Sequence, residues 1–369
     1  MKKINITYLI SDINKAVFFE HTALRLRERG VELSWILINS KDSELAHFLE
    51  EHHFEVAYLE ALSPLRSFSA IKACKKLLEQ WNTTVVHCHL GTANWVGLWA
   101  GLWAGVSKRI FTRHAGKSLK WNYKEAIIDQ IQNRLATDIV SISLNIHELL
   151  LAQGVSENKI HLIHHGFDLD RMKNHNVNEV ARIKSFYNPQ SKYPIIGVVA
   201  RWMEWKGIQY IIPAFEKLLE DYPNAKLCLF NASEKAAYAQ VLTPMLEKLP
   251  MGSYESIGFE SNVYDLYSLF DLYVHTPVDP YCEAFGQTYI EALAAGVPSI
   301  FTLSGVAREF AMDEPLATIV PFRDSEAIYE AMIELLKKDK HEVHHSPFFE
   351  TFTIPQYIQN LETLYFNNR

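Results

Sequence analysis

The sequence is poor in cysteine and has no long apolar run. Four cysteines occur in 369 residues, far apart and without a repeated short spacing: Cys74, Cys88, Cys228 and Cys282. This spacing argues against a disulfide framework and against a cysteine-based zinc site. No segment reaches the ~20 apolar residues of a membrane span, and the N-terminal residues lack the apolar run and cleavage site of a signal peptide. Together these absences favour a reduced, cytoplasmic protein.

Other absences exclude whole classes of function. No Gly-x-Gly-x-x-Gly follows a strand-like run, which argues against a dinucleotide oxidoreductase. No tandem repeat of solenoid length and no low-complexity segment occurs. The formal net charge of −7 argues against a general nucleic-acid binder. What remains is an ordinary globular composition, and 48% hydrophobic residues over this length suffice for two cores.

Apolar strand-like runs alternate with helical patterns along the chain, which predicts parallel sheets and an α/β class. The expected strands fall into two groups: Ile4–Ile10, Leu33–Ile38, Thr84–His87, Ile110–Thr112 and Ile139–Ser143, then Ile195–Val199, Lys226–Phe230, Leu272–His275 and Pro298–Thr302. Between the groups lies a polar stretch with a proline turn, so we predict a linker at 179–192. The expected domains are therefore 1–178 and 193–345, followed by a last helix within 346–369.

The loop after the expected strand Ile195–Val199 carries two cations and a glycine: Arg201, Lys206 and Gly207. Ligands of open parallel sheets bind at the carboxyl ends of strands, and a fixed pair of cations there suits a pyrophosphate. Taken alone, a solvated basic loop is an equally good interpretation.

Two glutamates, Glu283 and Glu291, stand on either side of a glycine turn and a helix start. Apolar spacing predicts a helix from about Gln287 to Ala295, which a glycine and a proline then end. Its free N–H groups near Gly286 and the positive end of its dipole suit a diphosphate. Because a diphosphate repels carboxylates, we expect the glutamates to accept hydrogen bonds from ribose and sugar hydroxyls. For an isolated pair of glutamates, ordinary solvated acids on a capped helix are the competing interpretation.

Taken together, the two segments resemble the retaining glycosyltransferases of family 4, group 1, which have the GT-B fold. The resemblance covers nearly the whole chain. It also rests on segments that agree in order and spacing: Phe111–His114, His165–Asp168, Ser256–Phe259, Asp271–Pro277 and Ser304–Glu309. It implies two Rossmann-like domains whose parallel sheets face each other across a cleft, and a C-terminal helix that crosses back to the first domain.

The resemblance also implies roles for individual residues. A nucleoside diphosphate sugar, with UDP or GDP, would bind mainly to the second domain. Arg201 and Lys206 would neutralise the leaving diphosphate, while Glu291 would bind the ribose and Glu283 the donor sugar. Further donor-binding positions would be Gly258, Phe285, Gly286, Gln287 and Thr288. Catalytic roles fall on His114, Arg201, Lys206 and Glu283, with His114 facing the sugar, and no metal or other cofactor is expected.

The acceptor side departs from the family. The glycine pair that commonly follows the first strand is missing, and Asp12 and Lys15 become acceptor-side candidates together with Lys117 and Lys120. The last two belong to a basic stretch: Lys108, Arg109, Arg113, Lys117, Lys120 and Lys124. Such a stretch is either a solvated face or a surface for an acidic acceptor or an anionic membrane. From the family we expect a glycan acceptor, free or lipid-linked, in cell-envelope or exopolysaccharide synthesis, and peripheral contact with the cytoplasmic face of the membrane.

Two rival functions stay open. A nucleotide-sugar epimerase or hydrolase of the same architecture would form product without any acceptor. A non-catalytic nucleotide-sugar binding protein would bind without turnover.

Three patterns invite misinterpretation. Asp168 and Asp170 form an Asp-x-Asp, which we interpret as a turn or helix cap rather than a metal site. His87 and His89 point to one face of a strand, where a cleft-lining or satisfied role is favoured over metal binding. The tryptophans and glycines of Trp95–Gly105 favour a helix laid tightly on a sheet over a membrane-docking helix.

Overall fold

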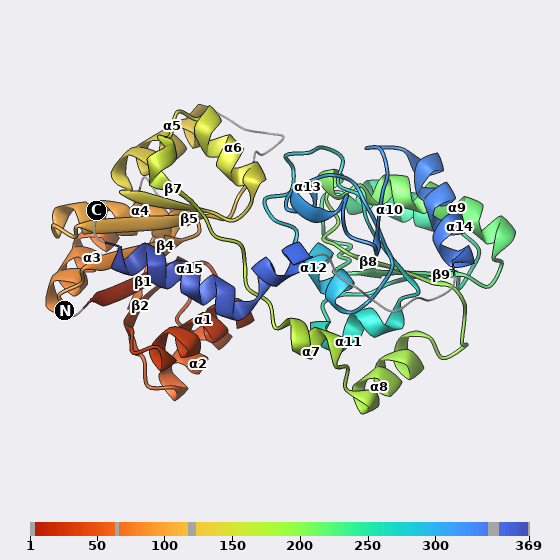
Figure 1. The fold of residues 1–369 in the computed structure, drawn as a ribbon, viewed down its shortest axis with the longest axis horizontal. Coiled ribbons are helices and arrows are strands. Elements are labelled where there is room, and N and C mark those ends of the chain that lie inside the picture. Colours follow the sequence, from red (N-terminus) through yellow and green to blue (C-terminus); the bar gives the residue numbers. More distant parts are fainter. Residues whose placement is uncertain (1–3, 63–65, 117–122, 261, 339–346, 368–369) are drawn as a thin grey trace. The chain divides into compact units, whose positions relative to one another are not determined.

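The structure, a computed structural model, describes residues 4–62, 66–116, 123–260, 262–338 and 347–367. It divides into two compact units (Figure 1). The first contains Met1–Phe167 and Ile354–Arg369, and the second contains Asp168–Thr353. Each unit is built around one parallel sheet, so the predicted pair of Rossmann-like α/β domains is confirmed.

The first unit holds a seven-stranded sheet in the order β3-β2-β1-β4-β5-β6-β7. Its strands are β1 Asn5–Ser11, β2 Glu32–Ile38, β3 Glu55–Leu59, β4 Val85–His89, β5 Lys108–Arg113, β6 Asp138–Ser141 and β7 Ile160–Leu162. All neighbours pair in parallel. The strand order reverses between β1 and β4. In open parallel sheets, ligands bind beside such a reversal, at the carboxyl ends of the strands.

Helices of the first unit connect the strands. They are α1 Val17–Glu28, α2 Glu44–Glu51, α3 Phe68–Gln80, α4 Gly91–Trp103, α5 Tyr123–Leu135 and α6 Leu144–Ala152. Helix α4 lies very close to the sheet. A Cβ on Gly97 would stand 2.4 Å from Cys88 Sγ, and one on Gly101 would stand 2.9 Å from Val86 Cγ1. Gly97 and Gly101 therefore serve close packing on β4, as predicted, whereas Gly105 lies beyond the end of the helix with no described atom near its Cβ position.

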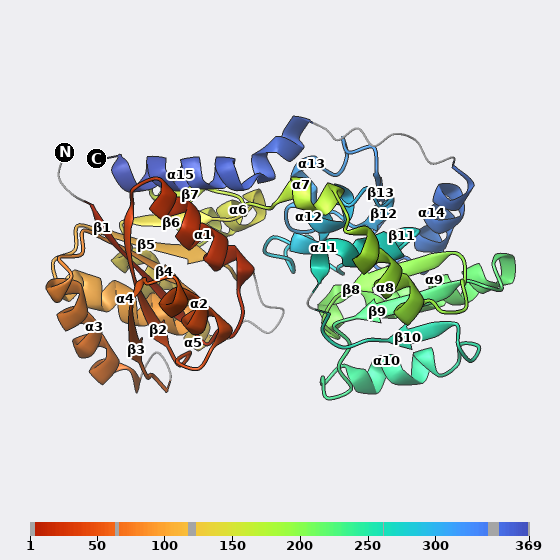
Figure 2. The same ribbon diagram turned by 90° about the horizontal axis from the view of Figure 1, so that it is seen from below.

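The last helix, α15 Ile354–Phe366, belongs to the first unit although it follows the second in sequence. In Figures 1 and 2 it is the dark blue helix among the red to yellow elements. A buried hydrogen-bond network holds it: Tyr365 Oη lies 2.5 Å from Tyr8 Oη and 2.6 Å from His87 Nδ1. His87 Nε2 in turn lies 2.8 Å from Thr112 Oγ1. Both ring nitrogens of His87 are thus satisfied, which confirms a structural role for this residue.

The second unit holds a six-stranded parallel sheet in the order β10-β9-β8-β11-β12-β13. Its strands are β8 Ile195–Val199, β9 Lys226–Phe230, β10 Tyr254–Ser256, β11 Leu272–His275, β12 Ser299–Phe301 and β13 Ala317–Ile319. The order reverses between β8 and β11. The loop that carries Arg201 and Lys206 leaves β8, and the loop that carries Glu283 leaves β11. Both candidate loops therefore start at the position where this fold binds ligands.

Helices of the second unit form two contacting groups. One contains α9 Ile208–Asp221, α10 Ala239–Leu246 and α14 Ser325–Lys337; the other contains α7 Leu169–Lys173, α8 Val177–Tyr187, α11 Val263–Leu266 and α12 Gln287–Ala294, while the short α13 is Ala307–Phe310. Helix α9 contributes most to the core, with Ile208, Ile211 and Phe215 fully buried.

The boundary between the units differs from the linker predicted at 179–192. Residues Val177–Tyr187 form helix α8, and the unit begins already at Asp168. The buried Asp265 explains the difference. Its carboxylate accepts two hydrogen bonds from Arg171, at 3.1 and 2.7 Å, and one from the Asn176 N–H at 2.8 Å. This polar stretch is therefore fastened to the second unit by charge-assisted hydrogen bonds, which a hydrophobicity pattern does not reveal.

Candidate functional site

A buried charge cluster joins the loops after β8 and β11. Lys206 Nζ donates to Glu283 Oε1, and His275 Nε2 lies 3.0 Å from the same oxygen. Only 7% of Glu283 is exposed and 1% of His275. The structure therefore brings together Lys206 and Glu283, which the sequence singled out, and adds His275, to which the sequence assigned no role.

A glycine sets the approach of the two loops. Gly207 has φ +76°, and a Cβ there would lie 1.8 Å from the carbonyl oxygen of Thr276. No other residue fits at this contact without moving backbone. On the other side, the Ser304 hydroxyl accepts from the Glu283 N–H at 3.3 Å and donates to the Asp279 carbonyl at 2.8 Å. Backbone packing thus fixes the position of Lys206 and Glu283.

The electrostatics keep Glu283 ionised. Burial alone would raise the pKa of its carboxyl, but the charge of Lys206 and the hydrogen bond from His275 outweigh burial and lower the pKa to about 2. Burial lowers the pKa of His275 below its ordinary value. The cluster is therefore a neutral imidazole, an ammonium and a carboxylate at neutral pH, in which Glu283 balances the charge of Lys206.

Helix α12 begins beside this cluster with an open N-terminus. Gly286 caps it with φ +87°, and no side-chain cap is found there among the described residues. A Cβ on Gly286 would lie 2.3 Å from the Tyr289 ring, so glycine is required here as well. The helix ends at Ala294, close to the predicted end. Its first turn presents the amides of Gln287 and Thr288 as donors to an anion.

Glu291 lies inside α12 and has a different environment from Glu283. It is partly buried, and its Oε2 accepts from Tyr267 Oη at 2.7 Å. Burial raises the pKa of the Glu291 carboxyl to about 7. Two carboxylates eight positions apart are thus held in opposite states: one is firmly ionised and the other titrates near neutral pH.

Arg201 and Gly258 are less tied to the cluster. Arg201 is exposed on the loop after β8 and makes no hydrogen bond or ion pair with any described residue. Gly258 follows the edge strand β10, where its carbonyl accepts from the Asn231 N–H at 3.1 Å. Phe285 is buried, 4% exposed, with its ring 6.0 Å from that of Phe352. Arg201 is thus the cation of this loop that is free to meet a ligand.

In the first unit, His114 lies among other histidines. It follows β5, and its Nε2 lies 3.0 Å from His89 Nδ1 at the end of β4. Its ring stacks on that of His165, with the centroids 5.6 Å apart. Burial lowers the pKa of His114 to about 4 and that of His89 well below its ordinary value. These imidazoles are therefore neutral at physiological pH.

Comparison with known proteins identifies the family. A model described as Glycosyltransferase Family 4 matches residues 16–171, and one described as Glycosyl transferases group 1 matches residues 180–346. The chain belongs to the group 1 glycosyltransferases of family 4. Mannosylfructose-phosphate synthase from Agrobacterium fabrum is 26% identical over 199 residues, which are 51% of this chain and 42% of that protein. The chain spans about half the length of the curated relatives it matches, or less.

Solved structures of other proteins share the fold of this glycosyltransferase. A glycosyltransferase from Rickettsia africae superimposes with a TM-score of 0.82 at 20% identity, covering 99% of this chain and 98% of that one. The Anabaena protein HepE, solved with UDP and glucose, has a TM-score of 0.75 at 18% identity, covering 98% and 95%. At such identities the likeness concerns the fold. Within the described residues, no helix is both long and apolar enough to cross a membrane.

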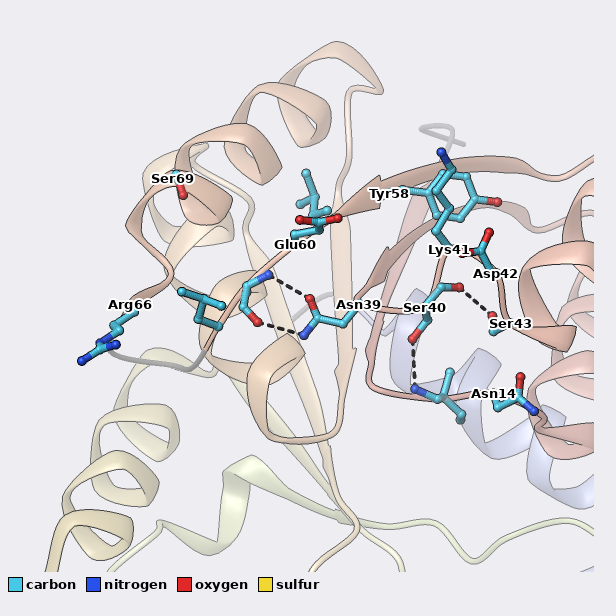
Figure 3. Close-up of a pocket in the computed structure, with 14 residues that line it drawn as sticks. Asn14, Asn39, Ser40, Lys41, Asp42, Ser43, Tyr58, Glu60, Arg66 and Ser69 are labelled. Atoms are coloured by element: carbon cyan, nitrogen blue, oxygen red, sulfur yellow. Dashed lines mark hydrogen bonds between the residues drawn. The ribbon is translucent and has the colours of Figure 1, made fainter.

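The acceptor-side candidates of this glycosyltransferase lie at the carboxyl ends of the first sheet. Asp12 Oδ1 accepts from Asn39 Nδ2 at 2.9 Å, and Lys15 pairs with Glu44 at 3.0 Å. A polar hollow of about 1140 Å³ opens beside them (Figure 3). Its walls come from the loops after β1 and β2, from the end of β3 and the loop after it, and from the start of α3: Ile13, Asn14, Asn39–Ser43, Tyr58–Leu62, Arg66 and Ser69. Lys117 and Lys120 lie outside the described residues.

Half of the basic stretch is engaged in internal contacts. Lys108 donates to the carbonyls of Leu364 and Asn367. Arg109 donates to the carbonyls of Leu135 and Val106, and Arg113 pairs with Asp129 at 2.5 Å. These three cations support the fold and do not form a binding surface, because their donors point to partners within the protein. Charge counting along a sequence cannot detect such pairing.

The Asp-x-Asp of the sequence is a helix cap. Asp168 Oδ1 accepts from the Arg171 N–H at 3.0 Å at the start of α7, which confirms the predicted cap. Among the described residues, no group of three or more His, Cys, Asp or Glu side chains is arranged to hold a metal ion.

Proposed function

We propose that this glycosyltransferase moves a sugar from a nucleoside diphosphate sugar, with UDP or GDP, to a hydroxyl of a glycan acceptor, and that it retains the anomeric configuration. One observation carries the proposal. The Lys206–Glu283–His275 cluster and the open N-terminus of α12 lie together where the strand order of the second sheet reverses. This combination suits a diphosphate with a sugar attached.

The leaving diphosphate gains negative charge as the bond to the sugar breaks. Arg201, Lys206 and the amides of Gln287 and Thr288 supply preorganised positive charge and N–H donors for it. Removing one such donor commonly costs about a hundredfold to a thousandfold in turnover. Donors of this kind replace the metal ion that other transferases use, so we propose a metal-independent reaction.

The two glutamates then bind hydroxyls. Glu283 is ionised and fixed by Lys206 and His275, so it presents a rigid carboxylate toward the donor sugar. Glu291, held by Tyr267, accepts from the ribose. We assign the sugar contact in the first unit to His114, as the family resemblance implies.

The acceptor is proposed to bind at the carboxyl ends of the first sheet. The hollow beside Asp12 and Asn14 is open and polar, which suits a hydroxylated molecule. We propose a glycan acceptor, in lipid-linked form if the enzyme works at the cytoplasmic face of a membrane, in cell-envelope or exopolysaccharide synthesis.

The test is release of the nucleoside diphosphate from a panel of UDP-, GDP-, ADP- and CMP-sugars, with and without acceptor extracts. Acceptor-dependent release, unaffected by excess EDTA and with the anomeric configuration kept in the product, supports the proposal. Product without acceptor identifies an epimerase or hydrolase instead, and tight binding without turnover identifies a binding protein. Loss of activity in EDTA that added metal restores would refute metal independence.

A further inference from the structure

We propose that His89 is a positioning residue that fixes the tautomer of His114, so that His114 carries its proton on Nδ1 and donates it in a hydrogen bond to a substrate oxygen. The inference deepens the proposed function and rests on the contact between His114 and substrate proposed there. Three observations support the inference: the hydrogen bond between His89 and His114, the aromatic rings that hold His89 in place, and the buried Nε2 of His89.

The hydrogen bond joins the ends of two neighbouring strands. His89 is the last residue of β4, and His114 directly follows β5. In the sheet, His89 is paired with Thr112, two residues before His114. The two rings therefore meet at the carboxyl edge, where His89 Nδ1 lies 3.0 Å from His114 Nε2. Only one of these two nitrogens can carry the proton that they share.

Aromatic rings hold His89 in place. Tyr8 stacks on it with centroids 5.2 Å apart and an interplanar angle of 15°. Phe19 meets it edge-on at 4.9 Å, and the His87 ring lies 4.3 Å away. A ring clamped on these sides keeps its orientation while substrate binds and leaves, so the nitrogen that faces His114 is always Nδ1.

The other nitrogen of His89 decides the direction of the hydrogen bond. His89 Nε2 is buried, and no described residue hydrogen-bonds to it. His89 borders a small cavity whose apolar lining includes Val140, Ile142, Ile163 and Leu361. Leaving an N–H unpaired in such a place is rarer and costlier than leaving a lone pair unpaired. The proton of the neutral His89 therefore belongs on Nδ1, which donates to His114 Nε2.

His114 then has one possible tautomer. Its Nε2 accepts from His89, so its own proton is on Nδ1. His114 Nδ1 makes no hydrogen bond with any described residue, and the side chain is partly exposed. Because this nitrogen presents an N–H, it can donate to a sugar or acceptor oxygen but cannot accept the proton of an attacking hydroxyl. His114 thus orients substrate and is not the general base.

Spectroscopy tests the tautomer without requiring activity. In the full chain labelled with ¹⁵N-histidine, long-range proton–nitrogen correlations distinguish Nδ1–H from Nε2–H, and His114→Gln identifies the His114 signals. The inference expects His114 as Nδ1–H and His89 as Nδ1–H. A His114 that carries its proton on Nε2 would overturn it, whatever the enzyme turns out to transfer.

Matched variants of His89 test whether its contact with His114 affects turnover. Asparagine places its amide near the position of Nδ1, whereas glutamine places it near Nε2. We expect His89→Asn to keep most turnover, and His89→Gln and His89→Ala to lose about tenfold to a hundredfold in kcat, with unchanged affinity for the free nucleotide. In the double variant His89→Ala/His114→Ala, turnover should be no lower than in His114→Ala alone, because His89 acts through His114.

The outcomes of these experiments distinguish the positioning role of His89 from the proposed function of the enzyme. Equal kcat in His89→Ala and wild type, with both folded by circular dichroism, would overturn the positioning role. Additive losses in the double variant would overturn it too, since His89 would then act independently of His114. If the wild-type protein releases nucleotide from no donor, the proposed function fails, and the tautomer measurement still decides this inference.

Discussion

Raising the pH from about 6 to about 8 should strengthen donor binding, and the ionisation of Glu291 should cause this increase in affinity. Burial raises the pKa of this carboxyl to about 7, while Tyr267 donates to it at 2.7 Å. To accept hydrogen bonds from two ribose hydroxyls, Glu291 has to be ionised. Below pH 7 the donor must therefore displace a proton before it binds, so its dissociation constant should fall as the pH rises.

The magnitude follows from the fraction ionised. With a pKa of about 7, roughly a tenth of Glu291 is ionised at pH 6 and nine tenths at pH 8. Affinity should then rise about tenfold across this window, or about 1.4 kcal/mol. Glu283 does not interfere, because with a pKa of about 2 it stays ionised throughout.

Calorimetry with an intact nucleoside diphosphate sugar measures this effect, because its diphosphate is a diester and does not titrate in the window. Two buffers with different ionisation enthalpies should reveal about half a proton released per donor bound near pH 7. Glu291→Gln should bind more weakly and lose the pH dependence, whereas Glu216→Gln, an exposed acid on α9, should keep it. A wild-type affinity that is flat between pH 6 and 8, or a slope that survives in Glu291→Gln, would refute the argument.

The same pKa shift affects stability in the absence of ligand. A carboxyl whose pKa is raised from 4.5 to about 7 in the folded protein favours folding below about 4.5, and this advantage disappears as the pH rises through 7. At pH 8 the ionised Glu291 costs up to about 3 kcal/mol. Glu291→Gln should therefore raise the melting temperature at pH 8 more than at pH 5. Equal shifts at the two pH values would count against the raised pKa.

Three further predictions concern Glu283, the two cations of the loop after β8, and Tyr365. Because the pKa of Glu283 is depressed, this carboxylate should stabilise the second unit by about 3 kcal/mol above about pH 4.5. This stabilisation should disappear as the pH falls toward 2. An acid-unfolding curve of Glu283→Gln that matches wild type would contradict this prediction. Lys206→Ala and Arg201→Ala should each lower turnover about a hundredfold or more, with the larger loss for Lys206→Ala; normal kinetics in both would remove the diphosphate assignment. Tyr365→Phe should destabilise the packing of α15 by about 1–3 kcal/mol because it leaves the buried Nδ1 of His87 without its partner, and hydrogen exchange of α15 equal to wild type would disprove this.

The strands predicted from the sequence are the inner strands of both sheets. The four that the sequence did not predict are β3, β7, β10 and β13, which are the edges of the two sheets. An inner strand of a parallel sheet is covered on both faces, so it reads as a continuous apolar run such as Ile195–Val199. An edge strand such as Glu55–Leu59 is only partly buried and mixes polar with apolar residues. Hydrophobicity alone cannot separate it from a loop.

The site shows a similar limit. The sequence identified Lys206, Glu283 and Glu291 because the order and spacing of their motifs can be read directly along the chain. It did not identify His275 as a partner of Glu283, although this histidine ends the strand that leads to the Glu283 loop, and that position is a usable signal. The contact between His89 and His114 depends on the pairing of β4 with β5, which no local pattern encodes.

Arg201 and Lys206 look equivalent in the sequence, but they have different environments in the structure. Arg201 is exposed and unpaired among the described residues, so removing it takes away one unit of attraction for the diphosphate. Lys206 is paired with a buried carboxylate, so removing it takes away the same attraction and also leaves Glu283 uncompensated beside the anion. A buried charge without its partner repels the ligand and destabilises the loop at once. The expected order of the two alanine variants follows from this difference in pairing, since the charge of the two side chains is the same.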